Sequence, residues 1–211
     1  MRIAYFGHDI HDATIAKRVA SFQRDGHDVT GYMMRRGPLA TVPWRNIDLG
    51  ETANVAYLQR LSAIWTGARL VTDDPAPLVN ADVILARNLD MLACAVIARH
   101  RLALSTPLIY ECLDIHHKLA GRGPVSATLR RLEAALLAET SLVAVSSPAF
   151  ESGYFARHHA GRYTSFLVEN RLVATPPRPT GPVEPVSGTV RIGWFGVLRC
   201  PRSLALLSAL A

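Results

Sequence analysis

The chain has 211 residues, a net charge of +6 at pH 7, 49% hydrophobic residues and 19% charged residues. This is the composition of an ordinary globular protein, and it excludes a disordered or coiled-coil chain, which would carry more charge and fewer apolar residues. No apolar run approaches the roughly 18 residues that span a bilayer. Its three cysteines are widely spaced and form neither a disulfide framework nor a zinc ribbon, which favours a reducing, cytoplasmic compartment.

The positive charge comes almost entirely from arginine, because only Lys17 and Lys118 among the 23 basic residues are lysine. Arginine matches phosphates and carboxylates geometrically, so nucleic acid, anionic lipid and nucleotide-sugar partners all have to be considered. The basic residues are scattered and contain no block of five, however. We therefore expect no nucleic-acid partner.

Short β-rich runs alternate with longer helical patterns along the chain, which predicts an α/β fold with a Rossmann-like parallel sheet and helices on both faces. The expected strands are residues 3–6, 28–33, 83–86, 107–112, 142–145 and 165–168, with one further strand within residues 45–55. The expected helices are residues 13–24, 56–68, 89–102, 126–138 and 148–156.

The helix expected over residues 126–138 has a clear apolar stripe. Its stripe consists of Val125, Leu129, Leu132 and Leu136, and the residues expected outside it are Arg130, Arg131 and Glu133. The pattern predicts that this helix packs on the sheet through the stripe.

The composition changes after residue 173, where the chain becomes rich in proline. Residues 1–173 are expected to form the first domain, and residues 174–189 read as an interdomain linker with five prolines. Residues 190–195 then predict a new strand, residues 196–201 a turn, and residues 202–210 a helix. One strand and half a helix cannot bury a core, so residues 190–211 are expected to be the start of a truncated second domain.

Polar residues follow the first strand, at an edge where open parallel sheets bind ligands. Gly7 allows a tight turn, and Asp12 is expected to cap the helix that follows. His8 and His11, together with Asp9 and Asp12, could ligate a metal, but histidines in polar loops more often only form hydrogen bonds, and we expect no metal. The chain has no Gly-x-Gly-x-x-Gly or Walker motif, so no dinucleotide cofactor is expected.

Three further strand ends carry candidate site residues. Asn88 follows the strand 83–86 and is suited equally to capping the next helix or to contacting a ligand. Glu111, Asp114 and His116 follow one another at the next strand end, and a carboxylate with a histidine two residues away suits proton transfer or the orientation of a hydroxyl. A set of satisfied surface groups is the alternative. Ser147 is expected to cap a helix that begins at a proline.

Two more candidate positions flank the linker. Asn170 follows the strand 165–168 at the same edge of the sheet. Gly196 and Arg199 lie in the first turn of the expected second domain, where a helix N-terminus and an arginine favour an anion. An ordinary glycine turn with a solvent-exposed arginine is the alternative.

Together, an ordered series of segments resembles the GT-B glycosyltransferases, in particular the family 4-like enzymes of bacterial exopolysaccharide and capsular polysaccharide assembly. The segments are FGHDIHDATIAKRVASFQRDGHDV, ARNLDMLA, YECLDIH, VSSPAFESGYF, LVEN and IGWFGVLRCPRSL, and they cover essentially the whole chain. The resemblance implies two Rossmann-like domains, of which the first binds the acceptor and the second most of the nucleotide-sugar donor. It also implies a retaining transfer that needs no bound metal.

The resemblance also implies roles for individual residues. It places Gly7, His8, Asp9, Asn88, Asp114, His116 and Ser147 in the cleft, and Gly196 and Arg199 near the donor diphosphate. With the strand-end positions added, we expect catalysis by Asp114 and His116 and substrate binding by Gly7, His8, Asp9, Asn88, Glu111, Ser147 and Asn170. Leu113 stands where many relatives carry a histidine that contacts the donor sugar. The acidic donor motif would lie beyond residue 211, so the chain alone is expected to be inactive.

Three alternatives accompany this interpretation. The chain could be a non-catalytic binding or scaffolding module, or one half of a split enzyme whose C-terminal half is supplied in trans. Because acceptors in such pathways are often lipid-linked, the helix 126–138 and the dispersed arginines could also rest on the inner face of the membrane. A helix that only faces the core would explain the same pattern.

Overall fold

A computed structural model describes residues 1–52, 57–169, 193 and 201–210, and for residues 57–61 it describes the backbone alone. The structure divides into two units, Met1–Val173 and Ala174–Ala211. In the second unit, helix α9 (Pro201–Leu210) confirms the helix expected there. The whole of the expected linker, and all of the strand and turn expected over residues 190–201 except residues 193 and 201, lie outside the described residues.

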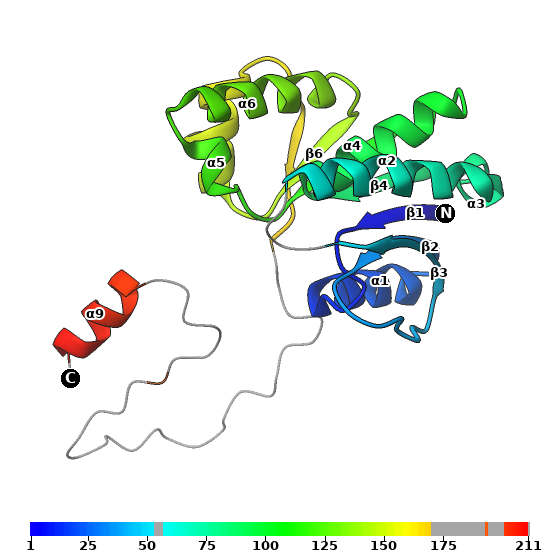
Figure 1. Cartoon of the computed structure of the whole chain (residues 1–211), viewed down its shortest axis with the longest axis horizontal. Helices are drawn as coiled ribbons and strands as arrows, with labels where there is room; N and C mark the ends of the chain where they lie inside the picture. Colours follow the sequence, from blue (N-terminus) through cyan, green and yellow to red (C-terminus); the bar gives the residue numbers. More distant parts are fainter. Residues whose placement is uncertain (53–56, 170–192, 194–200, 211) are drawn as a thin grey trace. The chain divides into compact units, whose positions relative to one another are not determined.

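The first unit is built on one sheet in which every strand pairs in parallel with its neighbours (Figure 1). Its strands are β1 (Arg2–Gly7), β2 (Asp28–Arg35), β3 (Arg45–Glu51), β4 (Val83–Arg87), β5 (Leu108–Cys112), β6 (Leu142–Val145) and β7 (Ser165–Leu167). The spatial order is β3-β2-β1-β4-β5-β6-β7. This is the doubly wound arrangement, and it confirms the predicted fold class and all seven expected strands.

The helices of the first unit are α1 (Ala13–Arg24), α2 (Tyr57–Asp73), α3 (Ala76–Val79), α4 (Asn88–Arg101), α5 (His117–Ala120), α6 (Pro124–Leu137), α7 (Pro148–Phe150), the π-helix η1 (Glu151–Phe155) and α8 (Ala156–His159). The capping residues of α1 and α7 are those predicted, because Asp12 accepts a hydrogen bond from the Thr14 amide and Ser147 accepts one from the Ala149 amide. The short helices α3 and α5 were not expected.

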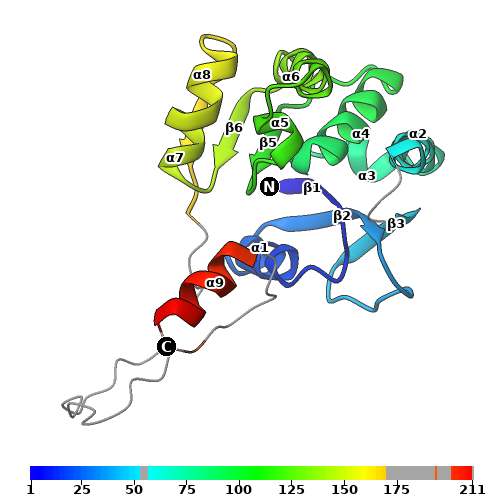
Figure 2. The same ribbon diagram turned by 60° about the vertical axis from the view of Figure 1, so that its left-hand side comes forward.

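The two faces of the sheet bury different sets of side chains, as the period of two along a strand requires. From β1, Ile3 and Tyr5 join the core beneath α1. Ala4 and Phe6 join the larger core that α2, α4 and α6 cover. Figure 2 shows α1 on the side of the sheet opposite to α2 and α4.

The prediction for α6 is confirmed for Leu136, which is buried, and for Leu129, which packs against the core, but it is wrong for the other half of the stripe. Val125 and Leu132, which the stripe assigned to the core, are 60% and 46% exposed, whereas Glu133, assigned to the solvent side, is 0% exposed. The buried face of α6 is rotated so that it is centred on Glu133 and the adjoining Leu136 and Leu137. This rotation is tolerated because Glu133 accepts hydrogen bonds from partners on η1 and α8.

The parallel strands bring their carboxyl ends to one edge, where the register fixes which side chains meet. Arg87 at the end of β4 pairs with Glu111 on β5. Phe6 pairs with Ala86, so the loop after β1 lies beside the end of β4. This edge carries the residues that the sequence singles out.

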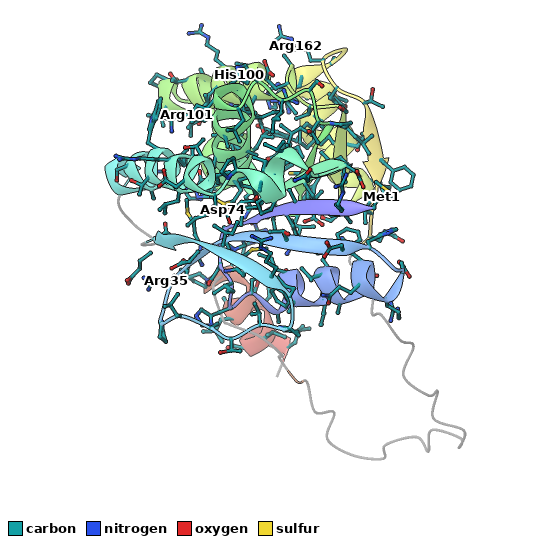
Figure 3. The ribbon with its side chains drawn as sticks, turned by 90° about the vertical axis from the view of Figure 1, so that its right-hand side faces the viewer. Met1, Arg35, Asp74, His100, Arg101 and Arg162 are labelled. Carbon is teal, nitrogen blue, oxygen red and sulfur yellow. The ribbon has the colours of Figure 1, made fainter. Side chains whose placement is uncertain are left out.

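Two surface properties bear on partners. In the part of the chain that the structure describes, no helix is long and apolar enough to cross a membrane. Figure 3 shows basic side chains such as Arg35, Arg101 and Arg162 on separate elements of the first unit. The dispersed positive charge inferred from the sequence is thus also dispersed in space.

Candidate functional site

A buried network of charged groups underlies the carboxyl edge of the sheet. The Arg87 side chain, which is 1% exposed, donates from Nε to Glu111 Oε2 at 2.7 Å. Tyr5 Oη donates to the same oxygen at 2.8 Å, and Arg18 Nε donates to Glu111 Oε1 at 3.0 Å. Both carboxylate oxygens therefore have charge-assisted partners, which is the condition under which a buried carboxylate is stable.

Burial, and then the neighbouring Glu111 carboxylate, raise the pKa of Tyr5 well above its usual value, so the phenol stays protonated and acts as a donor. The Arg87 guanidinium also lies over the Tyr5 ring, 5.5 Å from its centroid. These contacts join β1, β4, β5 and α1 at one point and fix the backbone from which the site residues project.

From this network a closed ring of polar contacts extends to the surface. Arg87 Nη1 lies 2.6 Å from Thr14 Oγ1, and Thr14 Oγ1 lies 2.7 Å from Asp12 Oδ1. Asp12 Oδ2 faces His8 Nε2 at 3.5 Å, and His8 Nδ1 lies 3.2 Å from Asn88 Nδ2. Because Asn88 follows Arg87 directly, the ring closes through the backbone.

The backbone of Asn88 has a conformation that few residues other than glycine adopt. Its φ is 69°, in the left-handed region that asparagine tolerates better than most residues. The residue opens α4 but does not cap it, because the N-cap position is Arg87 and has no side-chain cap bond. Of the two roles considered for Asn88, the structure thus excludes capping.

The environment of His8 favours the neutral form of its imidazole. Burial lowers the pKa of His8 below its usual value, and the Arg36 and Arg87 guanidinium groups act in the same direction, while Asp12 and Asp9 oppose it. The pKa of Asp12 is also lowered. Burial opposes this second shift, but the Thr14 hydroxyl and amide stabilise the carboxylate by hydrogen bonding.

Beside the ring lies a pocket of about 280 Å³ that gathers three predicted site residues, Asn88, Asp114 and His116. Its lining residues come from α2, β5, α6 and the segments around the starts of α4 and α5, and they are Ile64, Asn88, Leu89, Asp90, Ala93, Tyr110, Asp114, His116, Lys118, Leu119, Leu129 and Leu132. We call it the α4–α6 pocket. Its lining combines polar groups with leucines of α4, α5 and α6, which is the make-up of a small-molecule site.

The outer wall of this pocket is anchored by one arginine. Arg130 Nη1 on α6 donates to the carbonyl oxygens of Leu119 and Gly121, both at 2.7 Å. His116 caps the intervening α5 by accepting from the Lys118 amide at 3.3 Å. The segment that carries His116 and Lys118 is thereby tied to α6.

The other predicted residues lie in different surroundings. Gly7 lies in close packing, because a Cβ there would come within 2.3 Å of Met33 Sδ and would displace that side chain. Asp9 accepts from the His11 amide, Glu111 is 2% exposed within the buried network, and Ser147 caps α7. None of these four lines the α4–α6 pocket. The remaining predicted residues, Asn170, Gly196 and Arg199, lie outside the described residues.

Sequence reasoning missed the residues that hold the site together. Arg87 and Thr14 were not singled out, although Arg87 stands between a buried strand and Asn88, where a charged residue needs a buried partner. That position was the available signal. Arg18 and Tyr5 gave no comparable local signal, because their partner Glu111 is far away in the sequence.

Other chemistries receive no support from the described residues. They contain no group of three or more histidine, cysteine or acidic side chains placed to hold a metal ion. Burial raises the pKa values of Cys94 and Cys112 to about 12, so neither thiol is an activated nucleophile.

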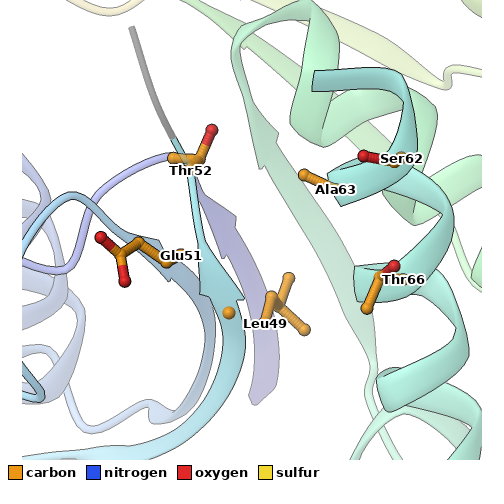
Figure 4. A pocket seen from close by; sticks show the side chains of 7 residues that line it. Leu49, Glu51, Thr52, Ser62, Ala63 and Thr66 are labelled. Carbon is orange, nitrogen blue, oxygen red and sulfur yellow. The ribbon is translucent and has the colours of Figure 1, made fainter. Parts of the chain in front are cut away.

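A second hollow of about 400 Å³ lies between the end of β3 and α2, lined by Leu49, Gly50, Glu51, Thr52, Ser62, Ala63 and Thr66. Figure 4 shows Leu49 directed toward α2 and the Glu51 carboxylate turned away from it. That carboxylate accepts from Arg35 at 3.3 Å. This hollow gathers none of the predicted site residues.

The parallel sheet and its strand order define a Rossmann-like α/β domain of the kind found in GT-B glycosyltransferases. Among solved structures, the apo form of the lipopolysaccharide outer core galactosyltransferase WaaB matches with a TM-score of 0.54 at 11% identity, over 86% of this chain and 50% of that chain. Acinetobacter baumannii MurG matches with a TM-score of 0.37 at 13% identity, over 69% of this chain and 41% of that chain, which is too low to support an argument.

The sequence itself is homologous to the succinoglycan biosynthesis protein ExoL of Rhizobium meliloti (strain 1021). The two are 35% identical over 217 residues, an alignment that covers 99% of this chain and 54% of ExoL. The chain thus spans about half the length of this relative. No protein-family model matches the chain.

Proposed function

We propose that the chain is the acceptor-binding part of a glycosyltransferase that moves a sugar from a nucleotide-sugar donor to a glycan or lipid-linked acceptor during polysaccharide synthesis. The observation that carries the proposal is the α4–α6 pocket, in which Asn88, Asp114 and His116 meet at the carboxyl edge of the sheet. The homology to ExoL over nearly the whole chain supports polysaccharide biosynthesis as the context.

In this proposal the pocket binds the acceptor, and Asp114 and His116 at its exposed rim orient the acceptor hydroxyl and handle its proton. The donor would be held by a second domain, which includes Gly196 and Arg199 near its diphosphate and is continued by sequence equivalent to the rest of ExoL, either in the same chain or in trans. The transfer would be retaining, and the leaving diphosphate would be stabilised by positive groups and helix N-termini rather than by a metal. The 211 residues alone would then be inactive.

A chimaera tests this function directly. Residues 1–173 joined to the second half of ExoL should transfer sugar from a nucleotide-sugar to a bacterial lipid extract, while the 211-residue chain should not. Replacing Asp114 by Asn or His116 by Ala in the chimaera should reduce transfer by about 10²-fold or more. Asn80→Asp, at the exposed end of α3, is the matched control. A folded, donor-binding chimaera without transfer would contradict the proposal, and so would transfer that both site variants leave intact.

We also propose that the protein works on the cytoplasmic, inner face of the membrane, held there peripherally by α6. Val125 of this helix is 60% exposed and does not line the α4–α6 pocket, and the exposed Arg122 and Arg131 lie nearby in the sequence. Exposed apolar and cationic residues together favour an anionic leaflet. Flotation with anionic liposomes at low salt should carry the chain upward, and the Val125→Glu variant should remain at the bottom. An unchanged distribution of that variant would contradict a role of α6.

A further inference from the structure

The hydrogen bonds of the polar ring have a fixed direction as far as Asp12. A guanidinium has only donors, so Thr14 Oγ1 accepts from Arg87 Nη1 at 2.6 Å. The single hydroxyl proton of Thr14 is then donated to Asp12 Oδ1, 2.7 Å away, and the Thr14 amide donates to the same oxygen. These bonds hold Asp12 as a carboxylate, and its second oxygen, Oδ2, faces His8.

The two ring nitrogens of His8 face partners of opposite kinds. Nε2 lies 3.5 Å from the Asp12 carboxylate, which favours an N–H at this nitrogen over a lone pair. Nδ1 lies 3.2 Å from Asn88 Nδ2, an amide nitrogen that can only donate. A neutral imidazole carries one N–H, so both contacts require the same tautomer, in which Nε2 carries the proton and Nδ1 accepts from Asn88.

Addition of a proton to His8 reverses what this histidine requires of Asn88. An imidazolium carries an N–H at both nitrogens, so Nδ1 becomes a donor and can no longer accept from Asn88 Nδ2. Rotation of the Asn88 amide by about 180° about the Cβ–Cγ bond, a torsion with broad preferences, brings Oδ1 to the place of Nδ2. The Nε2–H still faces Asp12. The contact between His8 and Asn88 is then kept in both states, with the amide in opposite orientations.

The charged groups around His8 come from three segments of the chain. Asp9 and Asp12 lie in the loop after β1, Arg36 follows β2, and Arg87 ends β4. The two aspartates favour the proton on His8, and the two arginines and burial disfavour it. Because burial is the largest of these effects, the pKa of His8 is lowered and the neutral form predominates at pH 7. The side chains of His8 and Asp12 are 21% and 25% exposed, so water reaches the pair and a proton can enter.

We infer that His8 is a positioning residue for the Asn88 amide and that protonation of His8 turns this amide over. Asn88 is one of the residues that line the α4–α6 pocket. A sugar that contacts the amide therefore favours one of its two orientations, and by linkage it changes the affinity of His8 for a proton. This consequence rests on the proposed function of the pocket as the acceptor site, whereas the relation between His8 and Asn88 does not.

Nuclear magnetic resonance on the ¹⁵N-labelled 211-residue chain tests the inference between about pH 8 and pH 5. At the upper end, His8 should carry its proton at Nε2, and a coupling across the hydrogen bond should connect Asn88 Nδ2 with His8 Nδ1. As His8 gains a proton, this coupling should disappear with the midpoint of the His8 titration, and Nδ1 should carry a proton that is protected from exchange. A neutral His8 protonated at Nδ1 would overturn the inference, and so would a coupling that persists in the protonated state.

Asn88→Asp provides a second test, because a carboxylate can only accept and so requires Nδ1 of His8 to donate. The substitution should raise the pKa of His8 by about one unit or more. Asn80→Asp, at the exposed end of α3, is the matched control and should leave the titration of His8 unchanged. A titration of His8 that Asn88→Asp leaves unchanged would contradict the contact.

Methyl β-D-glucopyranoside separates this inference from the proposed function. At saturation it should shift the backbone amides around Leu129 and change the midpoint of the His8 titration. Since a hydroxyl can donate or accept, the sign of that change reports which amide atom the sugar meets. If the amides shift and the midpoint does not, the linkage is wrong and the acceptor site stands. If the amides do not shift, the acceptor site is wrong, and the coupling alone decides whether His8 positions Asn88.

Discussion

Two buried glutamates, Glu111 and Glu133, are held in different ways. Glu111 uses both oxygens, with two arginines and a phenol as donors. Glu133 accepts from Tyr154 Oη and from His159 Nε2 through one oxygen, while its Oε1 and His159 Nδ1 have no partner within the described residues. The first is a balanced charge network beneath the candidate site, and the second is an incompletely satisfied cluster that joins α6 to η1 and α8.

The difference indicates which of the two glutamates fixes the positions of the candidate site residues. Around Glu111, four elements must meet at fixed positions so that Asn88 and His8 face each other beside the pocket. Around Glu133, the contacts only attach one outer helix to another. Substitutions at the two sites should therefore differ in magnitude and in what else they disturb.

Glu111→Gln should have the largest effect on stability. The substitution leaves Arg87, which is 1% exposed, without its carboxylate, and breaking a buried pair in this way lowers the free energy of unfolding by about 3–5 kcal/mol. Urea denaturation of the chain measures it. Glu51→Gln is the control, because this exposed glutamate pairs with Arg35 at the surface and should contribute less than about 1 kcal/mol. Equal losses from the two substitutions would show that the Glu111 network is not buried as described.

Glu133→Gln should cost less, about 1–2 kcal/mol. The glutamine carbonyl can still accept from Tyr154 and His159, and its amide replaces the oxygen that has no partner. The same denaturation experiment compares the two glutamates directly. A loss larger than that of Glu111→Gln would invert the comparison.

Two substitutions distinguish the contribution of the Asn88 side chain, which contacts His8, from that of its left-handed backbone. Asn88→Gly and Asn88→Ala both remove the amide that binds His8, but only glycine adopts a φ of 69° without strain. The alanine variant should be less stable than the glycine variant by about 1 kcal/mol, measured as the difference in free energy of unfolding. If alanine were the more stable of the two, Asn88 would not have the described backbone.

The smallest expected effect is on the pH dependence of the free energy of unfolding, through His8. Burial lowers the pKa of His8, so the unfolded chain binds a proton at this histidine more readily than the folded chain does. The stability that neutral His8 contributes is therefore present above about pH 6.5 and is lost as the pH falls through its lowered pKa. His8→Asn should lose less stability between pH 7 and pH 5 than the unsubstituted chain, as measured by urea midpoints. A steeper loss in the variant would contradict the described environment.

Much of the fold could be predicted from local sequence patterns. The seven strands, the helix over residues 13–24 and the caps Asp12 and Ser147 follow from alternation, turn residues and capping chemistry, all of which act within a few residues. The face of α6 could be predicted only in part, since Leu136 is buried as expected, whereas Glu133 is buried by partners on η1 and α8 that lie farther along the chain. An apolar stripe alone does not reveal such partners.

The candidate site could be predicted in part. Asn88, Asp114 and His116 follow strand ends, and parallel strands bring those ends together, so their convergence in one pocket follows from the topology. Glu111 was expected among the substrate-binding residues, but it is engaged by Arg18, Arg87 and Tyr5, a grouping that only the register of three strands and a helix produces.

A crystal structure of the chain soaked with methyl β-D-glucopyranoside tests the central claim most directly. The account predicts electron density for one sugar in the α4–α6 pocket, in contact with Asn88 and Asp114. Density confined to the other hollow, between Thr52 on one side and Ser62 and Thr66 of α2 on the other, would contradict the assignment of the acceptor site.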